Sequence, residues 1–264
     1  MTVRVAVFGA GGRMGSTVCE AVAADAELEL VAAVDPHHAG LDLRAVAAID
    51  PAQDLQIASD AQALVPAGAE VAVDFTVAEG ARRNLAWCAD HGVHAVVGTT
   101  GFSDADIEGF RPIFTRSNCL IAPNFAIGAV LMMHFAEKAA PFFETAEVIE
   151  LHHDQKVDAP SGTAIMTMQR MAAASGEWAP DPTVKEIVER ARGGKGPGDI
   201  PVHSVRLRGL VAHQEVLLGT MGQTLTIRHD SYDRSSFMPG VLLGIKRIGG
   251  CPGLTVGLEP LLGL

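Results

Sequence analysis

Near its start, the 264-residue chain reads VRVAVFGAGGRMG (Val3–Gly15). An apolar run of strand length leads directly into closely spaced glycines, and Arg13–Ala24 then has the spacing of a helix. A strand, a glycine turn and a helix in this order form the phosphate-binding unit of a dinucleotide fold. Glycines allow the tight turn, and the free N–H groups at the helix start face the negative charge of a pyrophosphate.

The glycine spacing departs from the plain GxGxxG pattern. Gly9, Gly11 and Gly15 form GxGxxxG, and Gly12 offers GxxGxxG as an alternative. Such a motif is weak alone, but Asp35 ends the next apolar run twenty residues after Gly15, where an acid accepts hydrogen bonds from a ribose. The acid favours NADH because it repels a 2′-phosphate, whereas Arg13 favours NADPH. We therefore expect NADH, NADPH or both.

The first half of the chain alternates strand-like and helical segments. Further apolar runs cover residues 30–34, 71–75, 94–97 and 119–122, with helical spacing over 78–91 and 104–115. This alternation predicts a Rossmann-type, doubly wound parallel α/β sheet with helices on both faces. Two polar loops, GTT from Gly98 and APNF from Ala122, follow the carboxyl ends of strands, where such sheets bind ligands.

The pattern changes after Pro123 and predicts a second, α+β domain. Helical segments over 125–138 and from Ser161 flank a strand over 146–151, and three alternating segments follow at 202–208, 215–218 and 224–229. We expect these three to be adjacent strands of an open mixed sheet, with a flexible glycine loop over 193–198 before them. The predicted domains are 1–122, completed by a helix and tail over 236–264, and 123–235.

The densest group of reactive side chains lies in ELHHDQKVDAPSGTA (Glu150–Ala164). His152, His153 and Lys156 leave a strand and can supply donors and a proton to an anionic substrate. Ser161 is a good N-cap, and the N–H groups of Gly162 and Thr163 at the helix start can receive a carboxylate. A zinc site on the paired histidines is the rival reading, but no third ligand stands at a recognisable spacing, so we expect no metal.

Composition excludes several classes of function. The net charge of -11 argues against nucleic acid and anionic membranes as partners, and residues 1–122 hold sixteen acids, seven arginines and no lysine. The uncharged stretch 117–136 is long enough to span a bilayer, but Pro123 and Asn124 interrupt it. With no basic leader and only four scattered cysteines, the sequence predicts a cytoplasmic protein.

Six segments resemble the 4-hydroxy-tetrahydrodipicolinate reductase (dihydrodipicolinate reductase) family. Four of them are GAGGRMG, VVGTTGF, IAPNFAIGAVLM and HHDQKVDAPSGTA. The other two, GLVAHQEVLLGTMGQTLTIRHDS and GLTVGLEPLL, resemble the actinobacterial branch of the family. The resemblance spans essentially the whole chain. It implies NAD(P)H-dependent reduction of a cyclic imine dicarboxylate to tetrahydrodipicolinate, on the diaminopimelate–lysine pathway. It also implies a homotetramer joined through sheets of the second domain.

The resemblance further implies a role for individual residues. His152 would be the proton donor and acceptor, Lys156 a proton donor, and the substrate contacts would be His153, Ser161, Gly162 and Thr163. The cofactor contacts would be Gly9, Ala10, Gly11, Gly12, Arg13, Met14, Asp35, Gly98, Thr99, Thr100, Ala122, Pro123, Asn124 and Phe125. Pro36 stands where some members carry an arginine after the cofactor acid, which leaves the preference between NADH and NADPH open.

Two other functions are compatible with the glycine turn. One is a different two-domain dehydrogenase of amino or keto acids, such as an aspartate dehydrogenase, although the HHDQK and SGT run does not predict such an enzyme. The other is a redox sensor that binds NAD(H) without turnover, which would have no use for a proton donor.

Overall fold

The computed structural model describes residues 2–50 and 54–264. Its chain divides into two compact units, Met1–Phe125 with Phe237–Leu264, and Ala126–Ser236. Residues 1 and 51–53 of the first predicted domain lie outside the described residues.

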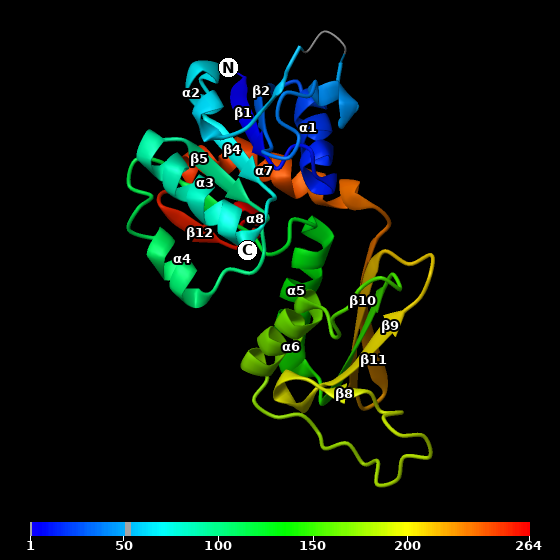
Figure 1. Cartoon of the computed structure of the whole chain (residues 1–264). Helices are drawn as coiled ribbons and strands as arrows, with labels where there is room; N and C mark the ends of the chain where they lie inside the picture. The colour runs from blue at the N-terminus through cyan, green and yellow to red at the C-terminus, as the bar shows by residue number, and fades with distance from the viewer. Residues whose placement is uncertain (1, 51–53) are drawn as a thin grey trace. The chain divides into compact units, whose positions relative to one another are not determined.

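The first unit contains a seven-stranded, all-parallel sheet in the order β12-β6-β5-β4-β1-β2-β3 (Figure 1). The strands are β1 (Val3–Phe8), β2 (Leu28–Val34), β3 (Ile57–Ala58), β4 (Val71–Asp74), β5 (His94–Val97), β6 (Cys119–Ile121) and β12 (Leu254–Val256). The predicted doubly wound sheet is confirmed. Because all strands are parallel, the loops after β1, β2, β4 and β5 emerge at the same edge.

Helices cover both faces of this sheet. They are α1 (Arg13–Ala24), α2 (Leu64–Ala67), α3 (Ala78–His91), α4 (Asp104–Phe110), α7 (Met238–Arg247) and α8 (Glu259–Leu262). On one face Leu85 and Cys88 of α3 join a core with Phe8 and Val97. On the other, Gly244 of α7 lies so close to the sheet that an added Cβ would be 3.0 Å from Leu120. The C-terminal segment thus completes the first unit.

The predicted helix over 104–115 is shorter than expected. The helix α4 ends at Phe110, and Arg111 is its C-cap. Pro112 follows and has no N–H to continue the helical hydrogen bonds, so the sequence carried the stop signal.

The second unit contains a five-stranded mixed sheet in the order β11-β10-β7-β9-β8. Its strands are β7 (Thr145–His152), β8 (Gly194–Lys195), β9 (Pro201–Arg206), β10 (Ala212–Thr220) and β11 (Gln223–Ser231). The helices α5 (Ile127–Ala139) and α6 (Gly162–Ala174) lie together against one face (Figure 1). Gly128 of α5 lies against the His229 ring, and Thr167 of α6 accepts a hydrogen bond from Gln214 at 2.8 Å.

The sequence prediction of three adjacent strands after residue 200 is wrong in one respect. Strands β10 and β11 do pair, but β7 lies between β10 and β9. Residues 207–211 cross the end of β7 instead of forming a hairpin, because Leu207 donates to the His152 carbonyl (3.0 Å) and His153 to that of Val211 (3.4 Å). The glycine loop over 193–198 also contributes a short strand, β8, which pairs with β9.

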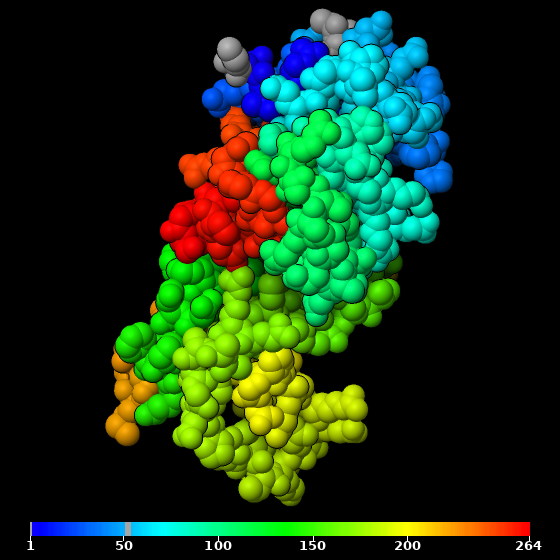
Figure 2. Space-filling view, turned by 90° about the vertical axis from the view of Figure 1, so that its left-hand side faces the viewer, coloured from blue at the N-terminus to red at the C-terminus, as the bar shows by residue number. Residues whose placement is uncertain are grey.

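A long arm, residues 175–193, connects α6 to β8. Figure 2 shows it in yellow-green, standing out from the second unit beside a hollow. A cavity of about 720 Å³ lies there, lined by Trp178, Arg192 and Lys195 among others. Three aliphatic side chains of the arm are largely exposed: Val184, Ile187 and Val188.

Short 3-10 turns complete the secondary structure. They cover Leu43–Ala45, Ala61–Ala63, Ala140–Phe142, Pro197–Asp199, Arg234–Phe237 and Ile248–Gly250.

Candidate active site

The glycine turn after β1 is shaped by contacts that exclude side chains. Gly9 has a φ of +73°, and the Gly12 amide donates to the Gly9 carbonyl at 2.9 Å. A Cβ on Gly15 would lie 1.9 Å from that same carbonyl oxygen. Gly12 is the N-cap of α1 and makes no side-chain cap bond, so the first-turn N–H groups face outward without a partner in the helix.

Asp35 braces this turn from the end of β2. Asp35 is buried, and its carboxylate accepts hydrogen bonds from the Gly11 amide (3.1 Å) and the His37 amide (2.9 Å). His38 Nδ1 lies 3.3 Å from one of its oxygens, and a Cβ on Gly11 would collide with the His38 ring at 2.2 Å. The acid therefore holds the glycine backbone in place as well as standing where a ribose would bind.

A cavity of about 640 Å³ lies beside the turn. Its lining includes Gly9, Gly12 and Asp35, together with Thr76, Arg83, Asn84 and Trp87. Among the residues that line this cavity, none comes from Gly98–Thr100 or Ala122–Phe125, so it gathers only part of the predicted cofactor set.

The loop residue Thr99 instead belongs to a buried junction centred on Asp74. This carboxylate, 2 % exposed, accepts hydrogen bonds from Thr99 Oγ1 (2.8 Å), Thr76 Oγ1 (2.7 Å) and Asn84 Nδ2 (2.7 Å). The junction ties the ends of β4 and β5 to α3. Sequence reasoning missed Asp74, although an acid that ends an apolar strand, as in VAVD, was an available signal.

These features fit a dinucleotide. A close-packed glycine turn lets phosphates approach the backbone, the helix start offers unpartnered N–H groups, and an acid follows at the neighbouring strand end. The residues present could therefore hold NADH or NADPH through the backbone of the turn and the carboxylate of Asp35.

In the second unit, Glu150 near the end of β7 contacts Arg206 of β9 and His152 of its own strand. Its side chain is fully buried; one oxygen accepts from Arg206 Nη2 (2.8 Å), the other from Arg206 Nη1 (3.0 Å) and from His152 Nδ1 (2.5 Å). Burial alone would raise the pKa of Glu150, but hydrogen bonds from His152, Arg206 and Ser204 outweigh it and lower the pKa to about 2. Glu150 is therefore an anion over the ordinary pH range.

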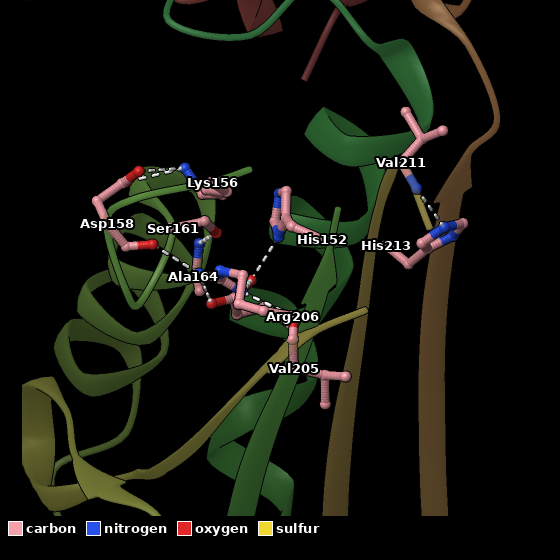
Figure 3. Close-up of polar contacts among 10 residues, drawn as sticks. His152, Lys156, Asp158, Ser161, Ala164, Val205, Arg206, Val211 and His213 are labelled. Atoms are coloured by element: carbon pink, nitrogen blue, oxygen red, sulfur yellow. Dashed lines mark hydrogen bonds and ion pairs between the residues drawn. The ribbon is translucent and has the colours of Figure 1, made fainter. Parts of the chain in front are cut away.

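Lys156 lies in the loop after β7 and points toward Asp158 (Figure 3). Its Nζ donates to both carboxylate oxygens at 2.8 Å, and this contact lowers the pKa of Asp158. Arg206 Nη2 donates to the Asp158 carbonyl at 2.6 Å. The loop that carries Lys156 is thereby fastened to the Glu150–Arg206 pair.

The helix α6 starts as the sequence predicted. Ser161 is its N-cap, is 4 % exposed and accepts a hydrogen bond from the Ala164 amide at 3.2 Å. Gly162 is exposed, while the Thr163 carbonyl accepts from Thr167 Oγ1 at 2.7 Å. The N-terminus of α6 is thus a positively polarised end with a fixed first turn.

Three other histidines of the second unit are one exposed and two paired side chains. His153 is exposed. His203 contacts Glu147 at 2.7 Å and His213 contacts Asp230 at 2.7 Å, so both have structural partners within the sheet. Over the described part of the chain, no group of three or more metal-ligating side chains comes together.

Glu150 and Arg206 were missed by sequence reasoning. They lie 56 positions apart, and only the parallel pairing of β7 with β9 brings them together. The one signal was an acid within an otherwise alternating strand, VIEL, next to the histidine pair.

Comparison with known proteins gives full-length matches. A family model described as "Dihydrodipicolinate reductase, N-terminus" matches residues 3–125, and one described as "Dihydrodipicolinate reductase, C-terminus" matches residues 128–262. The 4-hydroxy-tetrahydrodipicolinate reductase of Cutibacterium acnes is 52 % identical, over 99 % of each chain. That of Nocardia farcinica is 51 % identical over the whole of both chains.

Solved structures agree with these relatives. A dipicolinate-bound dihydrodipicolinate reductase from Paenisporosarcina sp. TG-14 is 41 % identical, with a TM-score of 0.87 over 98 % of this chain and 99 % of that one. An amine dehydrogenase from Mycobacterium smegmatis shares the fold, with a TM-score of 0.67 over 97 % of this chain and 95 % of that one, at 15 % identity. Across residues 2–50 and 54–264, no helix combines the length and apolar character needed to cross a membrane.

Proposed function

The chain belongs to the dihydrodipicolinate reductase family, and we propose that its reaction is carried by His152 and Lys156. The enzyme reduces 4-hydroxy-tetrahydrodipicolinate, with NADH or NADPH, in lysine and diaminopimelate synthesis. The observation that carries the assignment of residues is the convergence of His152, Lys156 and the N-terminus of α6 at one end of β7.

The substrate is a small dicarboxylate, and the start of α6 suits one of its carboxylates. The amides of Gly162 and Thr163 lie in the first turn, where the helix dipole attracts an anion, and Ser161 fixes that turn through the Ala164 amide. His153, which is exposed, would supply a further donor. The dipicolinate bound by the Paenisporosarcina relative is also a dicarboxylate, carried on an aromatic ring, so it is a suitable probe of this site.

Loss of water from 4-hydroxy-tetrahydrodipicolinate leaves a conjugated ring. The reduction then needs a hydride at this ring and a proton for the enamine that results. When bound, the reduced nicotinamide supplies the hydride. His152 has its Nδ1 against Glu150, which leaves Nε2 to give or take a proton. The Asp158 carboxylate fixes the Lys156 amine through two hydrogen bonds. Lys156 would supply a second N–H donor. A positioned acid typically contributes about 10²–10⁴-fold to such a step.

The cofactor set proposed for the first unit is unequally supported. Gly9, Gly12 and Asp35 line the cavity beside the turn, and Gly11 is braced by Asp35. Asp35 disfavours a 2′-phosphate, so NADH should bind more tightly than NADPH, with Arg13 at the start of α1 limiting the difference.

One assay tests the function. Purified enzyme is mixed with the cyclic imine, made in place from pyruvate and aspartate semialdehyde by the preceding synthase, and oxidation of NADH or NADPH is followed by absorbance. We expect rapid oxidation that requires the imine. Oxidation with oxaloacetate and ammonia instead would favour an aspartate dehydrogenase, and none with either mixture would favour a redox sensor.

The second unit is also the part through which we expect the chain to form a homotetramer. The sheet face opposite α5 and α6 is not covered by a helix of its own unit, and the arm over 175–193 exposes Val184, Ile187 and Val188. Burial of these exposed apolar side chains between neighbouring chains would stabilise the assembly. Light scattering on the purified protein should give four times the chain mass of 27.6 kDa, and a monomer would contradict this assembly.

We also propose a cytoplasmic location, and the free thiols support it. All four cysteines, each among the described residues, are free, and burial raises the pKa of Cys19 to about 12. Free thiols are typical of reducing compartments. Fractionation of the producing cells, with the enzyme followed by antibody, tests the location.

A further inference from the structure

Glu150 has no part in the roles assigned above, although it is an ionised carboxylate with no exposed surface. Burying a charge is unfavourable unless strong partners compensate for the lost water. Arg206 provides two parallel contacts to it, and the Arg206 side chain is itself only 19 % exposed. A buried ion pair of this kind often adds little to the free energy of unfolding. The role of Glu150 and Arg206 therefore lies in the other groups that they contact.

On one side the pair touches the imidazole. An ionised carboxylate can only accept hydrogen bonds, so the proton between Glu150 and His152 belongs to Nδ1. In the neutral ring this fixes the tautomer with Nε2 as the acceptor. Arg206 holds the same carboxylate oxygen at 3.0 Å, so the acceptor cannot swing away from the ring without breaking the ion pair.

On the other side the pair touches the loop that carries the lysine. Arg206 Nη2, which donates to Glu150, also donates to the Asp158 carbonyl. The side chain of Asp158 then receives both contacts from Lys156. A continuous chain of polar contacts thus joins His152, Glu150, Arg206, Asp158 and Lys156 (Figure 3).

Building on the roles proposed for His152 and Lys156, we infer that Glu150 and Arg206 are positioning residues. Together they fix the tautomer of His152 and the position of the loop that carries Lys156. Glu150 selects the His152 tautomer with the proton on Nδ1. Arg206 fixes Glu150 and places the Lys156 loop at a constant distance from the imidazole. Neither residue contacts the substrate in this assignment; both act through other side chains.

The first experiment reads the tautomer directly. Protein labelled with ¹⁵N in histidine is examined by NMR in mildly alkaline buffer, and His152 is identified from the spectrum of His152→Gln. We expect a single neutral tautomer that carries its proton on Nδ1. A proton on Nε2, or a mixture of the two forms, would overturn the inference, and this result needs no variant of Glu150 to fold.

The second experiment removes the charge. Glu150→Gln should release the tautomer preference and lower kcat about 10²-fold, because small misplacements of catalytic groups have effects of that size. The KM for the imine and the Kd for NADH should change little, and Glu150→Asp should restore part of kcat. Arg206→Lys keeps a positive charge but loses the fork, so it should lower kcat in the same way.

The strand supplies its own control. Glu147 also lies between a histidine and an arginine, with His203 at 2.7 Å and Arg192 at 2.6 Å, but on the opposite face of β7. Glu147→Gln should leave kcat and the His152 tautomer unchanged. An equal fall of kcat in Glu147→Gln and Glu150→Gln would show a general effect on the sheet and overturn the inference.

Failure of the inference and failure of the proposed catalytic residues give different results. If His152→Gln is inactive while Glu150→Gln and Arg206→Lys are as active as the native enzyme, the proposed site stands and the positioning pair is wrong. If His152→Gln is fully active, the proposed site is wrong, and a positioning role toward it fails with it.

Discussion

The two units prepare for their ligands with different parts of the polypeptide. In the first unit backbone groups dominate: glycines form the turn, and the Asp35 carboxylate accepts hydrogen bonds from the amides of Gly11 and His37. In the second, charged side chains from two strands and a loop converge around Glu150. The proposed roles fit this difference: the first unit would hold a ligand and the second would move a proton. Substitutions in the two units should therefore damage different steps.

The largest effect is expected from the second unit. His152→Gln removes the imidazole that Glu150 orients, so kcat should fall about 10²–10⁴-fold. The Kd for NADH, measured by fluorescence titration, should stay within about twofold, since no contact to the glycine turn is lost. A variant that lost NADH affinity as strongly as turnover would break the division between the two units.

In the first unit the strongest effect should come from Gly15→Ala. The added Cβ would lie 1.9 Å from the Gly9 carbonyl oxygen. The oxygen belongs to the backbone and the Cβ is fixed directly to the backbone of α1, so neither atom can easily give way. We expect a stability loss of about 1–3 kcal/mol by thermal unfolding, and a Kd for NADH at least about tenfold higher. Gly109→Ala is the control, because nothing lies within 4 Å of its Cβ position.

A smaller effect on cofactor binding is expected from Asp35→Ala. Hydrogen bonds to a charged group contribute about 1.5–3 kcal/mol, so the Kd for NADH should rise about ten- to hundredfold at most. The Kd for NADPH should rise less, since repulsion of its 2′-phosphate disappears with the charge. The exposed Asp90→Ala, which removes one charge from the same unit, should change neither constant.

The smallest effect concerns stability in acid. The pKa of Glu150 is lowered in the folded chain to about 2 from an ordinary value of 4.5, so its contribution to stability is complete above pH 4.5. That contribution should be lost as the pH falls from 4.5 toward 2. Acid unfolding followed by circular dichroism should show a steeper loss for the native chain than for Glu150→Gln across this window.

The sequence predicted the first unit better than the second, for a physical reason. Hydrophobic periodicity and glycine spacing act over neighbouring residues, so β1, α1 and α3 were located from local pattern alone. Ser161 was identified as an N-cap from chemistry that spans only three residues. The family resemblance supplied what periodicity does not: the reaction and the roles of the individual residues.

The strand order of the second unit and the charge pairs across its strands could not be predicted from the sequence pattern. The insertion of β7 between β9 and β10 depends on contacts over 50 residues apart, and sequence distance gives no sign of it. Glu150 and Arg206 meet only through that pairing. Asp74 was missed for a related reason, since its partners Thr99 and Asn84 reach it from two other elements.

In the proposed enzyme the second unit performs the proton transfer while the first only holds the cofactor. Lys156→Ala tests it most directly, with kcat for the imine and the Kd for NADH measured on one preparation. The account predicts that kcat falls about 10²–10⁴-fold and that the Kd for NADH stays nearly unchanged. An unimpaired kcat in this variant would contradict the account.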